Sequence, residues 1–230
     1  MSIKKKGLLG NAAEFGFLMT RLTKDQIQHR HAPAHARSGL ALVHNGRCGS
    51  TVLGTLLKQH PRMYWDGEAL TPHRPAERWF RYLQGMRRRS RTQDLDKLMR
   101  FARDRWYVLS AKRQLFPSVE AMFQDLDAAG FDRHVFLYRA NPLRWVVSIE
   151  VAVQAGYWHV RRGKAASLTR VQVPVQYPDG HTLVGRLQDY DGWHRQVRER
   201  LASRSPLELC YEDDVLTDPV AAYRRISRIP

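Results

Sequence analysis

The amino-acid sequence predicts an α/β fold, a three-layer sandwich with a mainly parallel central sheet. Short apolar segments typical of buried strands alternate with segments of helical pattern from residue 39 onward. Such alternation is typical of parallel sheets that are covered by helices on both faces. The chain of 230 residues is 43% hydrophobic, which suffices for one well-buried domain. We therefore expect an N-terminal helix or arm and a connector over 1–38, followed by a single α/β domain over 39–230.

The first half of the chain supplies the opening strand and helix of this domain. The apolar run 39–45 predicts a buried strand, and 50–60 predicts a helix that ends at Pro61. Residues 62–68 are a weaker strand candidate. Residues 73–104 have a helical and strongly basic pattern, with an expected break near RRRSRTQD at 87–94.

The second half continues the same alternation. The helix over 141–155 has the clearest start, since Asn141 can cap it and Pro142 occupies its first position. The helix over 183–203 contains Gly192, at which we expect an interruption. The other expected elements are strands at 106–112, 134–139 and 206–213 and helices at 118–130 and from about 219.

The charge of the chain indicates an anionic partner. Lys and Arg number 38 and Asp and Glu 22, so the net charge is +16 with His neutral. Such an excess favours nucleic acid, an anionic lipid surface, or a phosphorylated or sulfated small molecule. The strongest basic run, RRRSR at 87–91, is of a kind that usually forms a solvated helix face, with an anionic glycan, lipid head group or partner as the alternative ligand.

The cysteines and the lengths of the apolar runs indicate the expected cellular location of the protein. Cys48 and Cys210 are the two cysteines of the chain, and their spacing does not suit a metal site or a disulfide framework. We therefore expect a cytoplasmic protein without a metal. No apolar run approaches the roughly 18 residues that a membrane span needs. A homodimer and peripheral contact with an anionic membrane both stay open.

The segment ALVHNGRCGSTVLGTLL over 41–57 predicts an anion-binding loop. A strand, a loop with two glycines and a helix follow one another, so backbone N–H groups and the helix N-terminus can face a phosphate. Arg47 adds a fixed cation, and Ser50 and Thr51 add hydroxyl donors. The nucleotide triphosphate loop GxxxxGK[ST] is not matched, because two residues separate the glycines and no lysine precedes Ser50. An ordinary strand-to-helix turn with a serine cap is the alternative.

The segment FLYRANPLRWVVS over 136–148 predicts a second anion site. Arg139 emerges at the carboxyl end of a buried strand, and Ser148 lies within the first two turns of the next helix. Both can then face one anion at the sheet edge, where a planar guanidinium donates two hydrogen bonds to a phosphate. The alternative is that Ser148 packs in a helix groove and Arg139 pairs with an acid. Together, the two segments suit a ligand with two separated phosphate groups.

These segments resemble the sulfotransferases that use 3'-phosphoadenosine 5'-phosphosulfate (PAPS), in particular bacterial members and the trehalose- and carbohydrate-sulfotransferase branch. In that family the first loop often reads R-S-G-S-T-L-L, and here it is RCGSTVL over 47–53. The second segment often reads R-x-N-x-L-x-R-x-x-S, and this chain keeps Arg139, Asn141 and Ser148. HPRMYWDGE and LELCYEDDVLTDP resemble two further segments of the family. The resemblance spans about residues 39–220 and implies the P-loop NTPase-like sulfotransferase fold.

The resemblance implies an enzyme that moves a sulfuryl group from PAPS to a hydroxyl or amine of a carbohydrate, lipid or small-molecule acceptor. The product is 3',5'-ADP (PAP), and no metal is needed. Arg47 would stabilise charge on the leaving phosphate. Glu68 would be the base, because it ends a predicted strand at the edge that carries Arg47, with His60 and His73 as rivals. The expected cofactor-binding residues are Arg47, Cys48, Gly49, Ser50, Thr51, Arg139 and Ser148, and the expected acceptor-binding residues are Glu68, His73, Lys112, Tyr157 and Trp158.

Two other function classes are alternatives. A basic nucleic-acid-binding protein would explain the net charge but not the ordered pair of anion motifs, and the sequence contains no known DNA- or RNA-binding signature. We therefore expect no nucleic-acid partner. A P-loop kinase is argued against by the missing lysine of the loop. Further aromatic candidates for the acceptor site are Trp79, Phe80, Trp106 and Trp193.

Overall fold

The computed structural model describes residues 39–65, 67, 70, 95, 99, 102, 105–156 and 171–229. The strands are β1 (Gly39–His44), β2 (Met63–Trp65), β3 (Trp106–Lys112), β4 (Phe131–Tyr138) and β5 (Leu207–Cys210). The helices are α2 (Ser50–Leu57), α5 (Val119–Ala128), α6 (Pro142–Ala155), α7 (Leu183–Leu201) and α8 (Pro219–Ser227). Two single turns, η2 (Arg113–Leu115) and η3 (Tyr211–Val215), directly follow β3 and β5.

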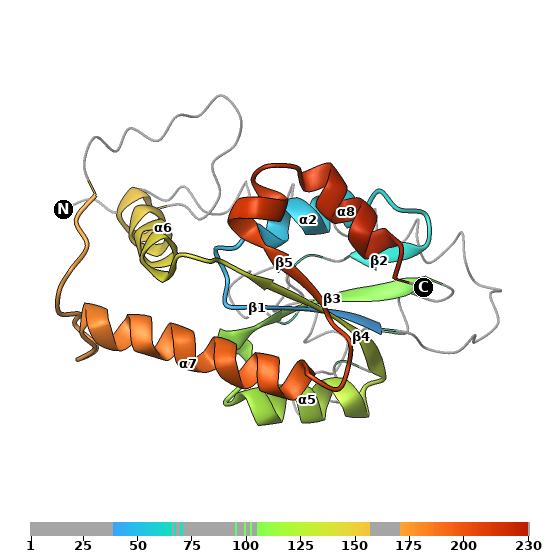
Figure 1. Ribbon diagram of the computed structural model, residues 1–230, viewed down its shortest axis with the longest axis horizontal. Helices are drawn as coiled ribbons and strands as arrows, with labels where there is room; N and C mark the ends of the chain where they lie inside the picture. Colours follow the sequence, from blue (N-terminus) through green and yellow to red (C-terminus); the bar gives the residue numbers. More distant parts are fainter. Residues whose placement is uncertain are drawn as a thin grey trace, which may run out of the picture.

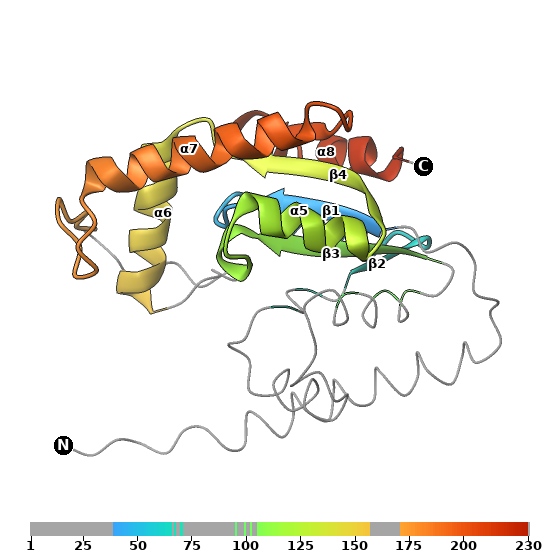
Figure 2. The same ribbon diagram turned by 90° about the horizontal axis from the view of Figure 1, so that it is seen from below.

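The five strands of the described residues form one all-parallel sheet in the order β2-β3-β1-β4-β5. Helices α2 and α8 lie on one face of this sheet, and α5 and α7 lie on the other (Figure 1 and Figure 2). Helix α6 leaves the carboxyl end of β4 and packs against α7. The predicted α/β class with a parallel central sheet is thus confirmed.

The central strand β1 explains how the layers are held together. All six of its residues are buried, because a parallel strand covered by helices on both faces has no solvent side. Leu40 and Leu42 belong to the apolar cluster that contains Leu53 of α2 and Ile226 of α8. Ala41 and Val43 belong to the cluster on the α5 and α7 face. The two faces of one strand therefore build the two halves of the core.

Most predicted element positions are confirmed, and three need correction. Strand β2 ends at Trp65 instead of 68, so Glu68 does not end this strand. Helix α6 begins as expected, with the Asn141 side chain accepting the N–H of Arg144 at 3.0 Å. Helix α7 is continuous through Gly192, so the expected interruption is wrong. Burial of Trp193 and of other α7 side chains outweighs the cost of one glycine, about 1 kcal/mol. The last strand ends at Cys210 instead of 213, because the Asp214 carboxylate accepts the N–H of Cys210 at 2.6 Å and turns the chain into η3.

Several predicted segments lie outside the described residues. These are the N-terminal segment 1–38, the basic run 87–91 and most of the expected helix over 73–104. Within that helix, Leu95, Met99 and Ala102 are described, and all three are helical and buried. Their spacing places them on one helix face, which packs into the core cluster on the α5 and α7 side. Among the described helices, none is long and apolar enough to cross a membrane.

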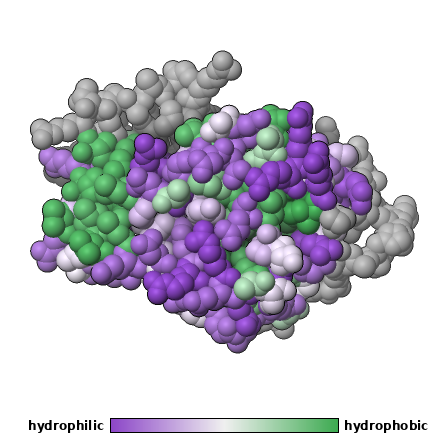
Figure 3. All heavy atoms as spheres, in the orientation of Figure 1, coloured by the Kyte–Doolittle hydropathy of each residue, from purple (hydrophilic) through white to green (hydrophobic). Residues whose placement is uncertain are grey.

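The outward face of α6 is apolar. Leu143, Val147 and Val153 are all exposed on this helix, and Figure 3 shows a hydrophobic area over α6 beside a largely hydrophilic surface. Ser148, which belongs to the predicted anion site, is on the same helix. The helix therefore separates an apolar outer surface from the polar edge of the sheet.

The register of the strands brings their carboxyl ends to one edge. His44, the last residue of β1, pairs with Lys112 of β3 and with Leu137 of β4. The chain then leaves β1 toward α2 on one face, and leaves β3 toward α5 on the opposite face. The carboxyl ends of the neighbouring strands β1 and β3 therefore form a topological switch point, where ligands of open parallel sheets bind.

Candidate functional site at the carboxyl edge of the sheet

The loop between β1 and α2 has an unusual backbone. Gly46, Arg47 and Gly49 have φ angles of 81°, 56° and 82°. Glycine adopts this left-handed region readily, but an arginine there costs about 1–2 kcal/mol. Arg47 is one of two non-glycine residues with positive φ in the described part of the chain. Strain of this kind is tolerated mainly where the side chain has a task at a functional site.

The loop ends at an N-terminus of α2 that no side chain caps. Gly49 is the N-cap residue, and its carbonyl accepts the N–H of Leu53 at 3.1 Å. The N–H groups of the first turn have no acceptor within the helix and carry its partial positive charge. Ser50 is buried and Thr51 is exposed. The expected arrangement of backbone donors at this loop is thus present, with Thr51 accessible to a ligand.

Gly49 also allows close packing of the loop on η3. A Cβ atom at this position would lie 2.8 Å from Cδ2 of Tyr211, whereas one at Gly46 would meet nothing within 4 Å. We expect Gly49→Ala to lower the free energy of unfolding by about 2–4 kcal/mol, from backbone strain plus overpacking. Gly46 has a similar φ, so Gly46→Ala should lower the free energy of unfolding by only about 1–2 kcal/mol. Urea denaturation of both variants tests this, and equal losses would contradict the packing.

Cys48 points into the protein. Its side chain is 2% exposed and belongs to the cluster on the α2 and α8 face. Burial raises the pKa of its thiol to about 12, so it is protonated at neutral pH. The predicted cofactor contact of Cys48 is therefore restricted to its backbone.

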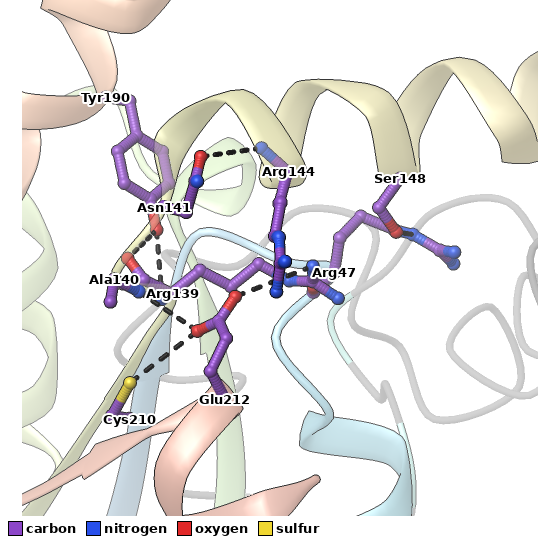
Figure 4. A network of polar contacts seen from close by, with 9 residues as sticks. All are labelled: Arg47, Arg139, Ala140, Asn141, Arg144, Ser148, Tyr190, Cys210 and Glu212. Carbon is purple, nitrogen blue, oxygen red and sulfur yellow. Dashed lines mark hydrogen bonds and ion pairs between the residues drawn. The ribbon is translucent and has the colours of Figure 1, made fainter. Parts of the chain in front are cut away.

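Arg47 and Ser148 are brought together from two separate elements. The Arg47 Nε donates a hydrogen bond of 3.0 Å to the Ser148 Oγ on α6 (Figure 4). Arg139, just after β4, donates from Nε to the backbone carbonyl of Arg47 at 2.5 Å. The two predicted anion segments therefore form one cluster. Ser148 was expected beside Arg139, and the direct partner it has here is Arg47.

Arg139 is fixed from three sides. Its guanidinium carbon lies 4.1 Å from the centre of the Tyr211 ring, and its Nη1 is 3.8 Å from a Glu212 carboxylate oxygen. The Tyr190 hydroxyl accepts the N–H of Arg139 and donates to its carbonyl, both at 3.0 Å. The other Glu212 oxygen accepts the N–H of Ala140 at 3.0 Å. The Arg139 side chain is 12% exposed, and its Nη2 has no hydrogen-bond partner among the described residues.

The cluster concentrates positive charge in a partly buried place. The pKa of Arg47 is lowered, first by burial and then by the charge of Arg139. Figure 4 also shows the Arg144 side chain extending from α6 on the side of the loop. An anion bound here would relieve the repulsion between the guanidinium groups. In the described part of the chain, no group of His, Cys, Asp and Glu is suited to hold a metal ion.

His44, the last residue of β1, holds the glycine loop in place through its ring nitrogens, a role that no local sequence pattern assigned. Its Nδ1 accepts the N–H of Gly46 at 3.0 Å, and its Nε2 is 2.8 Å from the Ser110 Oγ. Burial, and secondarily the charge of Lys112, lowers the pKa of His44 to about 3. The ring is therefore neutral, carries its proton on Nε2 and donates to Ser110. A histidine that ends a buried strand just before a glycine loop is the sequence signal that could have indicated this role.

The remaining predicted residues fall into four groups. Trp193 is buried in the core cluster on the α5 and α7 face. Lys112 ends β3 and pairs in register with His44, so it reaches the same edge. His60 lies three residues before β2, and Trp106 is the first residue of β3. Both are therefore at the opposite edge of the sheet, which removes His60 as a base and Trp106 as an acceptor contact. Glu68, His73, Tyr157, Trp158, Trp79 and Phe80 lie outside the described residues.

Tyr190 is a contributor that the sequence left unassigned, whereas the place of Glu212 beside the end of the last strand predicts either a positioning or a structural role. Each is far from Arg139 in sequence, by 51 residues for Tyr190 and by 73 for Glu212, so local pattern could not pair them. Glu212 follows β5 in the YED segment, which did point to this edge of the sheet.

No protein-family model, curated protein or solved structure matches this chain.

Proposed function

We propose that the chain is a PAPS-dependent sulfotransferase with a P-loop NTPase-like sulfotransferase fold. The observation that carries the proposal is the hydrogen bond of 3.0 Å between Arg47 and Ser148. It joins the glycine loop after β1 to the helix after β4, so that two guanidinium groups, a hydroxyl and a helix N-terminus share one edge of the sheet. A ligand with two separated phosphate groups suits this combination better than a single phosphate does.

In the proposed reaction, an acceptor oxygen or nitrogen attacks the sulfur of PAPS. The bond between sulfur and the bridging phosphate oxygen breaks, PAP leaves with the electron pair, and a base takes the acceptor proton. Arg47 and the N–H groups at the start of α2 would bind the 5'-phosphosulfate and stabilise the charge that develops on the leaving oxygen. Arg139 and Ser148 would bind the 3'-phosphate. Such donors are fixed before reaction, so they need no reorganisation and no metal.

Most residues of the proposed acceptor site are predicted from the sequence alone. Lys112 is at the same edge as Arg47, and Glu68, as base, together with His73, Tyr157 and Trp158 completes the proposed set. Both cysteines are free thiols, which agrees with a reducing compartment such as the cytoplasm.

The net charge of +16 also favours a nucleic-acid-binding protein, and a thermal-shift experiment separates the classes. Ligands that bind only the folded state raise the melting temperature by mass action. We expect PAP to give a larger shift than ATP with magnesium or a mixed-sequence oligonucleotide at matched concentration. The largest shift with the oligonucleotide would favour the nucleic-acid class, and the largest shift with ATP and magnesium would favour a kinase.

A further inference from the structure

Exposed apolar side chains gather at the end of the molecule that α6 and the start of α7 form. Of the eight large hydrophobic side chains that are exposed in the described part of the chain, five belong to this end: Leu143, Val147 and Val153 on α6, Val184 on α7, and Val175 in the segment before α7. Figure 3 shows a hydrophobic area that covers α6 and continues toward the start of α7, on the left of the view. The exposure is therefore concentrated in one area and not scattered singly over the surface.

Hydrogen bonds hold the segment before α7 against α6. The Gln154 side chain donates from Nε2 to the backbone carbonyl of Gln172 at 2.5 Å, and its Oε1 accepts the N–H of Gln172 at 3.2 Å. The N–H of Leu183, the first residue of α7, donates to the carbonyl of Val175 at 2.8 Å. The exposed valines of this segment and of the two helices are thus carried by one connected framework.

The core between α6 and α7 does not need these exposed residues. Trp145, Val146 and Tyr190 are buried there and form a hydrophobic cluster of their own. Large contiguous apolar areas are rare on soluble monomers, and those that occur mark contacts with proteins, ligands or membranes. The apolar area at α6 and α7 therefore calls for an occupant.

The charged residues of α6 present positive charge beside the apolar area. The helix has two charged residues, of which Arg144 is exposed and Glu150 is buried. Asp179, in the turn before α7, is paired with Arg186 at 2.6 Å and so adds little net charge. Arg144 lies between Leu143 and Val147 in the sequence, so an occupant of this surface meets an apolar area and a cation together.

The sequence that continues from α6 is also basic. Residues 157–170 connect the end of α6 to Val171, and they contain four basic residues, Arg161, Arg162, Lys164 and Arg170, but no aspartate or glutamate. Both ends of this segment are attached to the framework of the apolar area, which keeps the four charges within its reach. Apolar residues that can enter a bilayer and basic residues that attract anionic lipids are the two signals that membrane-surface binding combines.

Charge also decides between a lipid surface and a second copy of the chain. Each copy has a net charge of +16. Pairing two copies through this area would bring Arg144 and the basic segment of each toward those of the other, and such repulsion opposes association. A bilayer with anionic head groups offers an apolar interior and the opposite charge at once. It is therefore the occupant that this surface fits.

We propose that α6 and the start of α7 form a docking surface for an anionic lipid bilayer. Leu143, Val147 and Val184 enter the boundary between head groups and acyl chains, and the basic residues beside them meet the head groups. Ser148 lies on the same helix and bonds Arg47, so the carboxyl edge of the sheet lies close to the bound lipid surface. The proposal does not depend on the sulfotransferase function, because it involves neither PAPS nor an acceptor.

The test compares three variants that change the charge equally at equivalent helix positions. Leu143, Val184 and Val220 are each the second residue of their helix, and they are 46%, 62% and 45% exposed. An aspartate near a helix N-terminus is favourable, so all three aspartate variants should remain folded, which circular dichroism checks. Leu143→Asp and Val184→Asp change the proposed surface, and Val220→Asp, on α8, is the matched control.

Binding is measured by co-sedimentation at physiological ionic strength with vesicles of phosphatidylcholine alone and with vesicles that contain one quarter phosphatidylglycerol. We expect the unmodified protein to bind the anionic vesicles and to bind the neutral ones much more weakly. Leu143→Asp and Val184→Asp should each lower the partition coefficient on anionic vesicles at least about fivefold, and Val220→Asp less than about twofold.

Equal losses in the three variants would show that net charge alone attracts the protein, and would overturn the docking surface. Absence of binding to the anionic vesicles would overturn it as well. A dimer in light scattering that Leu143→Asp and Val184→Asp dissociate would assign the area to a second copy of the chain instead. Because these measurements use neither PAP nor PAPS, their outcome leaves the proposed sulfotransferase function to its own tests.

Discussion

Replacing Arg47 with glycine should lower the rate of sulfuryl transfer from PAPS about 10²–10³-fold, the usual loss when one preorganised donor to a developing charge is removed. The guanidinium is held by Ser148 and lies in the loop that would face the leaving phosphate. Glycine suits the backbone at this position, since Arg47 has a φ of 56°. The relief of strain should offset the lost hydrogen bond, so the free energy of unfolding should change by less than about 1 kcal/mol.

Two further variants separate charge from position. Arg47→Lys retains the charge without the planar fork, so we expect an intermediate rate. Ser148→Ala leaves the guanidinium but removes its anchor, and should reduce the rate by less than Arg47→Gly does. The rates come from single-turnover transfer of ³⁵S from labelled PAPS. An unchanged rate in folded Arg47→Gly would show that Arg47 does not act on the leaving group.

Replacing Glu68 with glutamine should lower turnover by about 10²–10⁴, the usual contribution of a positioned general base. The sequence alone predicts this role, since the strand expected over 62–68 would end at Glu68. In the structure β2 ends three positions earlier, at Trp65, and is parallel to β3. Glutamine retains the size and hydrogen-bonding capacity of the side chain and removes its ability to take a proton. PAP affinity should remain nearly constant, since the base would face the acceptor.

The pH dependence of the Glu68→Gln variant provides the control. If Glu68 is the base, the acidic limb of the single-turnover rate against pH should disappear in the variant. Loss of PAP binding instead would assign Glu68 a role at the nucleotide. Unchanged turnover in a step limited by chemistry would move the base to His73 or to the acceptor itself.

The sequence predicted the central elements well because their signals are local. The run 39–45 is apolar on both faces, as a strand covered by two helical layers must be, and Asn141 with Pro142 marks a helix start by its own hydrogen bond. The same locality explains why Arg47 and Ser148 could be expected at one edge. Each follows a parallel strand, and parallel strands end together.

Local sequence patterns could not predict which side chains from distant segments contact one another. The pairing of Arg47 with Ser148 spans 101 residues, and that of His44 with Ser110 spans 66. Which partner each side chain takes depends on the crossing of α6 over the edge and on the register of β1 and β3. Gly192 was misjudged for a related reason, because the buried face of α7 stabilises the helix and only the packed structure shows it.

The most direct test of the central claim is the affinity of the protein for PAP and for ADP, measured by isothermal titration calorimetry in the unmodified chain and in Ser148→Ala. Both nucleotides carry two phosphates, but PAP has one of them at the 3' position. If the Arg47 loop and the Arg139–Ser148 segment form one site for two separated phosphates, PAP should bind at least about tenfold more tightly than ADP, and Ser148→Ala should reduce this preference. Equal affinities for PAP and ADP in the unmodified chain would contradict the account.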